Sequence, residues 1–354
     1  MNTGKSIVEL AEEVMRRAKT AEDFVVDTQQ LVMKPDTNNL VFEGQESGLV
    51  LSDHAHAQIS QWVDIPKKYY DRMLINSPAL LAGNVNHWFH NRENTVRRMV
   101  RTLDGTARAF LSDRYRRIDN HQILETILPV LLESPDIEIV SCDVTDTRLY
   151  VKALFPKIQG EVVEGDVVQS GVVISNSEVG AGKLSVLPLV YRLVCTNGLI
   201  RESSSDLGLS QLHLGKRIRG SNSNYQIYRD ETIMADDRAL MMKLEDSIRA
   251  FNSMEVFTDI LNSMKASTMG ERIVEPVKAV ETLGKTLDLS EKERNSFLEN
   301  LIRDRDYSQY GAMNAVTHIA NHTKNYDRAT ELETLGGRVL DLSKSQWSRV
   351  ANAA

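Results

Sequence analysis

Arginines gather in one short stretch of the sequence, together with a single tyrosine. Between Arg97 and Asn120 there are seven arginines against three acidic residues. A guanidinium group offers a planar fork of donors that matches two phosphate oxygens, and an aromatic ring can stack on an unpaired base. The stretch therefore favours contact with nucleic acid. Its candidate residues are Arg97, Arg98, Arg101, Arg108, Arg114, Tyr115, Arg116 and Arg117.

A second group of cations follows a later apolar segment. Lys216, Arg217 and Arg219 precede a polar Gly/Ser/Asn loop, and Lys183 and Arg192 would extend a groove with them if the strands share a sheet. The alternative for this group is a solvated strand end. The alternative for the first stretch is that Asp113 and Asp119 pair with the arginines and that Tyr115 packs in the core.

Other familiar motifs are incomplete. The segment from Ser177 to Leu184 contains Gly-Lys, but it lacks the glycine and the Ser or Thr of a phosphate-binding P-loop, and a strand rather than a helix follows it. We therefore expect a glycine-bearing hairpin turn there.

No arrangement of residues commits the chain to catalysis, and none calls for a cofactor. The histidine pairs lack the glutamate of a zinc-protease motif, the two cysteines lack metal-ligand or hydrolase spacing, and no serine elbow is present. Three acids would allow a metal-dependent nuclease, which stays an alternative. The residues weighed are His54 and His56, His87 and His90, His318 and His322, Cys142 and Cys195, and Asp53, Asp113 and Glu178.

Periodicity and turn signals place these residues on elements. Asp104-Gly105 between two extended apolar runs favours a tight β-hairpin over 95–112, and Asn120 is expected to cap the helix that follows it. Pro188 within an apolar run indicates an edge or a bulge. Helices are expected at 7–18, at 53–62 and in two further segments up to 91, at 120–133, and at 233–264, 272–283, 291–302, 310–322 and 328–340. Strands are expected at 24–26, 40–42, 137–144, 148–155, 167–175, 184–195 and 212–218.

These elements predict an α+β fold. A mixed, mostly antiparallel central sheet with flanking helices would be followed by a helical C-terminal region. We expect three parts: an N-terminal region of helices and short strands over 1–92, a central α+β core with the arginine-rich hairpin over 93–224, and the helical region over 225–354.

Composition narrows the class of protein. Apolar residues make up 42% and charged residues 26% of 354 residues, which excludes collagen-like and wholly disordered chains. The net charge of −7 does not by itself indicate a nucleic-acid partner. No apolar run approaches a membrane span or the core of a signal peptide, so we expect a cytoplasmic protein with no membrane partner.

Three segments together resemble the phage- and plasmid-like protein family with a domain of unknown function 932. They are 108–120, 192–199, and Asn314 to Thr317 with His322, and the resemblance spans roughly 40–325. It implies a protein carried by a mobile element in a bacterial cytoplasm, and it implies no catalytic residues.

The leading hypothesis is a non-enzymatic protein that binds DNA, preferably single-stranded, in annealing-type recombination or replication. A homo-oligomer would provide the long track of backbone contacts that annealing needs. The alternatives are a protein that binds and inhibits or regulates a host factor, as anti-restriction proteins do, and the metal-dependent nuclease.

Overall fold

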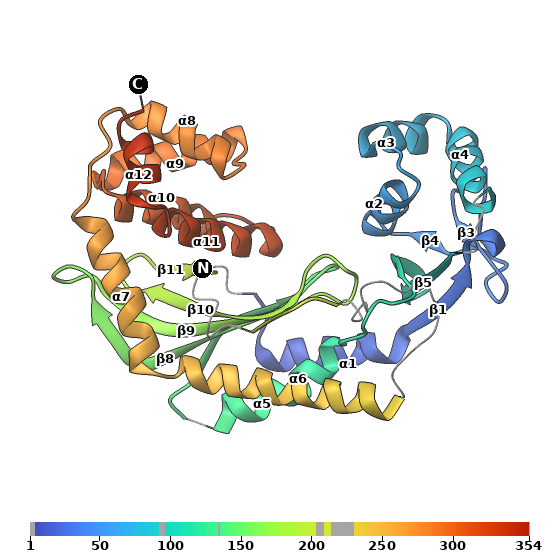
Figure 1. Ribbon diagram of the computed structural model, residues 1–354, viewed down its shortest axis with the longest axis horizontal. Helices are drawn as coiled ribbons and strands as arrows, with labels where there is room; N and C mark the ends of the chain where they lie inside the picture. The colour runs from blue at the N-terminus through green and yellow to red at the C-terminus, as the bar shows by residue number, and fades with distance from the viewer. Residues whose placement is uncertain (1–3, 92–95, 134, 203–208, 214–229, 354) are drawn as a thin grey trace.

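The structure is a computed structural model that describes residues 4–91, 96–133, 135–202, 209–213 and 230–353. It confirms the α+β class, with a curved, mostly antiparallel sheet, flanking helices and a helical C-terminal region (Figure 1). The helices are α1 (Ile7–Thr20), α2 (Asp53–Trp62), α3 (Lys67–Asn76), α4 (Pro78–His90), α5 (Asn120–Glu133), α6 (Asp230–Phe251), α7 (Met254–Thr268), α8 (Pro276–Thr286), α9 (Glu291–Asp304), α10 (Gln309–Asn321), α11 (Tyr326–Leu340) and α12 (Lys344–Ala351), with one 3₁₀ turn, η1 (Thr28–Gln30).

The smaller of the two main sheets contains the arginine-rich hairpin. Its order is β1-β5-β6-β4, and only the β4–β6 pair is parallel. Helices α2 to α4 cover one face around a core that includes Tyr70, Phe89 and Phe110. The strands are β1 (Ala21–Asp27), β4 (Val50–Leu51), β5 (Arg97–Leu103) and β6 (Thr106–Ser112), and a separate pair is formed by β2 (Val32–Met33) and β3 (Leu40–Val41).

The turn of the hairpin is the one that its sequence predicts. Asp104 and Gly105 both have positive φ, 50° and 76°, as a two-residue primed turn requires. The hairpin pairs with β1 on one side and β4 on the other, so this sheet joins residues from both sides of the boundary expected at position 92. The hairpin therefore packs with the N-terminal elements.

The larger sheet has the order β11-β10-β9-β8-β7, and β12 also pairs with β10. Helices α1, α5 and α6 pack on one face around Leu10, Ile127 and Leu244, and they run beneath the sheet in Figure 1. Its strands are β7 (Glu138–Val144), β8 (Leu149–Glu161), β9 (Val167–Asn176), β10 (Leu184–Arg192), β11 (Asn197–Ile200) and β12 (Leu209–Gln211).

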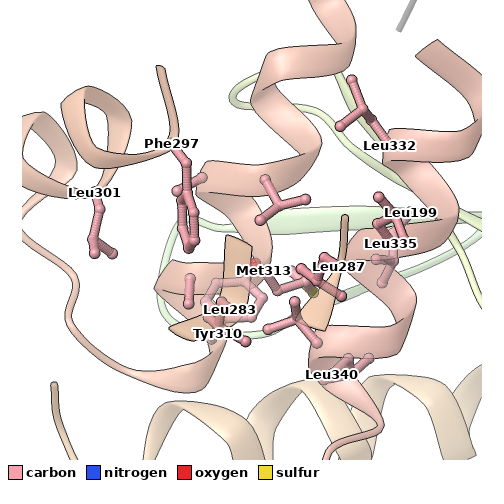
Figure 2. Close-up of a cluster of buried hydrophobic side chains, with 14 of the residues drawn as sticks. Leu199, Leu283, Leu287, Phe297, Leu301, Tyr310, Met313, Leu332, Leu335 and Leu340 are labelled. Atoms are coloured by element: carbon pink, nitrogen blue, oxygen red, sulfur yellow. The ribbon is translucent and has the colours of Figure 1, made fainter. Parts of the chain in front are cut away.

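The C-terminal helices form the third core. Leu283, Phe297, Met313 and Leu335 come together there, and Leu199 joins them from β11, which fastens this block to the sheet (Figure 2). The Ser-x-x-Glu pattern of Ser290 and Glu293 predicts a capping box, and the two side chains form one at the start of α9.

Several expected boundaries were wrong. The helix expected over 233–264 is two helices, α6 and α7, because the chain leaves helical geometry at Asn252 and Ser253. The expected strand over 184–195 ends at Arg192, and α12 was not anticipated. Most of the strand expected over 212–218 lies outside the described residues.

Pro188 lies inside β10 at a place where one side of the strand is open. Leu184 to Val186 pair with β12 and Leu189 to Arg192 pair with β11, so Pro188 faces the gap between them. A residue without an N–H group is tolerated there, because the position is locally an edge.

Candidate functional site

The arginine-rich hairpin meets the β9–β10 turn, and we call this contact the junction. It comprises β5, β6, the segment Ser112 to Asn120 and the turn from Ser177 to Lys183. The expectation of a glycine-bearing hairpin turn is confirmed, since the turn joins antiparallel β9 and β10 and Gly180 has a φ of 78°. A Cβ at Gly180 would lie 2.7 Å from Leu111, so glycine allows the close approach.

A bulge in the hairpin directs Arg108 into the junction. Arg101 pairs with Ala109, whereas Thr102 pairs with Ala107, which leaves Arg108 as the extra residue of β6. Its side chain is 9% exposed, and Nη1 donates to Glu178 Oε2 over 2.7 Å.

Glu178 is the acceptor at the centre of the junction. Its second carboxylate oxygen accepts from the backbone N–H of Asn120 at the start of α5, and its carbonyl oxygen accepts from Arg101. The expectation that the Asn120 side chain caps α5 needs correction, because its Oδ1 accepts from Asn176 instead. A carboxylate at a helix N-terminus also suits the helix dipole.

Arg101 is more completely engaged than any other arginine of the hairpin. Its side chain is 3% exposed, and it donates to Asp23 and Asp119 over 2.7 Å each. Burial acts to lower the pKa of Arg101, but the Asp119 and Asp23 carboxylates outweigh it and raise that pKa above its ordinary value. Arg101 is thus a charged tie between β1, β5 and the start of α5.

The ring of Tyr115 has a partner inside the protein. It stacks on His213 with centroids 5.0 Å apart and planes within 3°, and its hydroxyl donates to the Ser177 carbonyl. Tyr115 is 9% exposed, and burial raises its pKa. The expectation that this ring stacks on a base does not fit this arrangement, because the face it would offer is covered.

Three further arginines also have partners within the fold. Arg116 bridges to Asp236 and Asp237 of α6, and Arg192 donates to Asp166 over 2.6 Å beside the ring of Tyr310. Arg98 lies over the rings of Trp62 and Phe110.

Four of the expected cations are exposed. Arg97 begins β5 and Arg114 follows β6, at the same open end of the hairpin, since Arg98 pairs with Ser112. Lys183 is exposed at the end of the β9–β10 turn. Arg117 is 55% exposed, with one long contact of 3.5 Å to Asp23. Lys216, Arg217 and Arg219 lie outside the described residues.

A polar pocket of about 280 Å³ opens beside Arg117, and we call it the junction pocket. It lies where α1, the smaller sheet, the start of α5 and the β9–β10 turn converge. Its charged lining is Arg17, Asp23, Arg101, Arg108, Arg117, Asp119, His121 and Glu178.

Sequence reasoning missed Asp23, which accepts from both Arg101 and Arg117 across the sheet. It considered Glu178 only as a metal ligand. Within the described part of the chain, no three or more His, Cys, Asp or Glu side chains gather as a metal site would need. An acid in a glycine-bearing turn was the one local signal for Glu178, and nothing local marked Asp23.

The histidines make contacts within the fold. His54 Nε2 lies 2.9 Å from the Val179 carbonyl oxygen, and His56 Nδ1 lies 2.9 Å from the Tyr70 hydroxyl. His90 Nε2 lies 2.9 Å from the Leu31 carbonyl oxygen, and the His318 and His322 rings are 5.2 Å apart on α10.

The two later segments of the resemblance pack on each other. Asn197 donates to the Asn314 carbonyl oxygen over 3.5 Å. Asn321 on α10, next to His322, donates to Asn197 Oδ1 over 2.7 Å and to the Cys195 carbonyl over 3.2 Å. Thr196 between them has a φ of 53°, which is uncommon for a branched residue. These residues shape the turn between β10 and β11 and hold it on α10.

None of the helices that the described residues form combines the length and apolarity needed to cross a membrane. No curated protein and no solved structure matches the chain. Residues 109–213 match a family model whose description is domain of unknown function (DUF932), and this range contains β6 from Ala109 onward, the whole β9–β10 turn and His213. Residues 109–213 are therefore a DUF932 domain, and this segment forms most of the junction.

Proposed function

We propose that this protein binds the phosphate backbone of nucleic acid through the exposed cations around the junction. The observation that carries the proposal is the exposure of Arg97, Arg114, Arg117 and Lys183 on three segments that meet there. Guanidinium and ammonium groups that remain in water are free to replace the counterions of a phosphate backbone.

The buried arginines have a different task in this proposal. Arg101 and Arg108 hold the smaller sheet, α5 and the β9–β10 turn in one arrangement, and so fix the segments that carry the exposed cations. Base stacking by Tyr115 is not part of the proposal, because His213 occupies its face. A preference for single-stranded nucleic acid would therefore depend on the path that its phosphate backbone takes across the exposed cations.

The biological setting is proposed from the resemblance to phage- and plasmid-borne proteins. A protein that binds backbone without cleaving it suits annealing-type recombination or replication of a mobile element in the cytoplasm of a bacterial host. Assembly of several copies would lengthen the track of cations beyond Arg97, Arg114, Arg117 and Lys183.

Fluorescence anisotropy of labelled single- and double-stranded oligonucleotides tests the proposal. Binding that weakens as salt rises is the expected result, because counterions are released when phosphates are contacted. Absence of binding at low salt to either form would overturn it. A chelator added to the same samples separates binding from metal-dependent cleavage.

Binding to a partner protein is the second candidate, and the groove between α5 and α6 favours it. The groove has a volume of about 620 Å³, and apolar Ile118, Val130 and Met241 line it together with acids and arginines. A mixed lining of this kind suits a protein segment. A host protein recovered after nuclease treatment and lost with Met241→Asp would support this candidate, and recovery unchanged by Met241→Asp would contradict it.

A further inference from the structure

We propose that the junction pocket is a binding site for a phosphoryl group, supplied either as a free phosphate or nucleotide or as the phosphorylated end of a strand. The strand-end source rests on the proposed function, whereas the free-phosphate source does not. Arg101, Arg108, Arg117 and His121 line the pocket together with Asp23, Asp119 and Glu178. The remaining charged residue of the lining, Arg17, is bound to Glu13 and to the Val144 and Thr145 carbonyl oxygens.

The three carboxylates are already engaged by cations. Asp119 accepts from Arg101, Asp23 accepts from Arg101 and Arg117, and Glu178 accepts from Arg108. A metal cation would have to displace these guanidinium groups to reach carboxylate oxygens. A phosphate dianion in the pocket would contact no unpaired carboxylate. The carboxylates hold the arginine side chains in place beside it.

Arg108 supplies the observation that points to a ligand. Its side chain is nine-tenths buried, yet Nε is a buried donor with no acceptor among the described residues. A buried donor left unpaired costs about 1–3 kcal/mol, so native proteins rarely keep one without an ion, a water molecule or a functional reason. The bulge that turns Arg108 into the junction pocket is a further local irregularity at the same residue.

Two further side chains at the opening of the junction pocket can contact the oxygens of a phosphoryl ligand. Arg117 is half exposed and His121 is partly exposed, and both line the same pocket as Arg108. A phosphoryl group seated on Arg108 would present its outer oxygens to these two side chains. Arginine suits such a ligand because its fork binds two oxygens at once.

Isothermal titration calorimetry with inorganic phosphate and with deoxyadenosine 5′-monophosphate tests the pocket itself. We expect both to bind the full chain, and binding to weaken about tenfold in Arg117→Ala and in His121→Ala, as the loss of one charge-assisted contact implies. Arg114→Ala is the matched control, because Arg114 is exposed nearby but does not line the pocket. Absence of phosphate binding, or equal loss in the control, would overturn the proposal.

A variant at Arg108 adds a second readout. Arg108→Lys keeps the positive charge beside Glu178 but removes Nε and the fork, so we expect the affinity for phosphate to fall about tenfold while the circular dichroism spectrum is unchanged. An unchanged affinity in a folded Arg108→Lys protein would contradict the assignment of Arg108. If that variant does not fold, the Arg117 and His121 variants still decide the question.

Oligonucleotides with and without a 5′-phosphate separate the two sources of the ligand and the two proposals. Tighter binding of the phosphorylated strand, lost in His121→Ala, identifies a strand end. Free phosphate that binds while no oligonucleotide does would leave the pocket standing and overturn the backbone proposal. If oligonucleotides bind equally with and without a 5′-phosphate and the protein does not bind free phosphate, the pocket proposal is overturned and the backbone proposal stands.

Discussion

At the scale of the residue, Glu178 determines how the junction is held together. One carboxylate accepts from Arg108 and from the first N–H of α5, while the carbonyl of the same residue accepts from Arg101. Glu178 and Arg108 are both at least nine-tenths buried, so water cannot replace either partner. Removing one charge of such a pair leaves the other uncompensated.

We therefore expect Glu178→Gln to lower the free energy of unfolding by about 3–5 kcal/mol. Urea unfolding followed by circular dichroism measures the change. Asp113→Asn is the control, since Asp113 is an exposed acid of the Ser112 to Asn120 segment of the junction and its substitution should change stability by less than about 0.5 kcal/mol. Equal effects of the two substitutions would show that the buried pair does not matter to stability.

At the scale of the element, the β5–β6 turn isolates the effect of backbone geometry. Gly105 has a φ of 76°, and nothing lies within 4 Å of the place where a Cβ would be added. Gly83 in α4 has equally open space but ordinary helical geometry. The two glycines therefore differ in conformation and not in crowding.

Gly105→Ala is expected to lower the free energy of unfolding by about 1–2 kcal/mol, because an L-residue is strained in the left-handed region. Gly83→Ala should raise it by up to about 1 kcal/mol, since alanine favours the helix. Thermal unfolding of both variants checks the pair. A stabilised Gly105→Ala protein would show that the turn does not need positive φ.

Also at the scale of the element, an ion pair joins α9 to α11, and its contribution to stability depends on pH. Arg328 donates to both carboxylate oxygens of Glu293, and this contact lowers the pKa of Glu293 to about 2. A lowered pKa in the folded state stabilises the protein above the unfolded pKa of about 4.5, and this contribution is lost as pH falls from there toward 2.

The difference in unfolding free energy between the wild type and Glu293→Gln should accordingly be largest at neutral pH and shrink between pH 5 and about 2. Urea titrations at a series of pH values measure it. The exposed first-turn residue Glu291 provides the control Glu291→Gln. A difference that stays constant over this range would contradict the assigned ion pair.

At the scale of the whole molecule, a fully buried ion pair joins the larger sheet to the C-terminal helices. Lys152 on β8 donates to Glu333 on α11 over 2.5 Å, and both side chains are 0% exposed. The Lys152 ammonium also lies 5.0 Å from the centre of the Tyr326 ring. Breaking such a pair is costly, although replacing both members by apolar residues need not be.

We expect Lys152→Met alone to lower the free energy of unfolding by about 3–5 kcal/mol, and Lys152→Met with Glu333→Met to recover most of that loss. Chemical unfolding of the three proteins measures the coupling. If the single variant does not fold, a folded double variant still supports the account. A double variant less stable than the single one would contradict it.

The sequence alone was sufficient to predict the α+β class of the fold and the order of most of its helices and strands, but not the break between α6 and α7 or the helix α12. Apolar periodicity, the Asp104-Gly105 turn and the Ser290 capping box are local signals, and the structure contains the elements they predict. Which arginines remain in water depends on Asp23, Glu178 and Asp237, which lie 70 to 121 positions from their partners in the chain. Contacts over that separation leave no periodic signal.

Burial of Tyr115 shows the same limit. Its sequence neighbours are polar and charged, so the sequence left stacking on a base and packing in the core both open. The structure shows the second, because His213 and the Ser177 carbonyl reach the ring once the chain has folded. The expected set of site residues was therefore a mixture of arginines that hold the junction and cations that remain exposed around it.

The central claim is that the exposed cations, and not the whole arginine-rich stretch, contact nucleic acid. The salt dependence of oligonucleotide affinity tests it most directly, in the wild type and in a variant with Arg97, Arg114, Arg117 and Lys183 replaced by alanine. The matched control replaces four exposed lysines of the C-terminal helices, Lys278, Lys285, Lys292 and Lys344.

The account predicts that the slope of log affinity against log salt for a single strand becomes less steep by about 3 in the junction variant, since each lost phosphate contact contributes about 0.7. The control should keep the wild-type slope. Equal slopes in the junction variant and the wild type, or an equal loss in the control, would contradict the account.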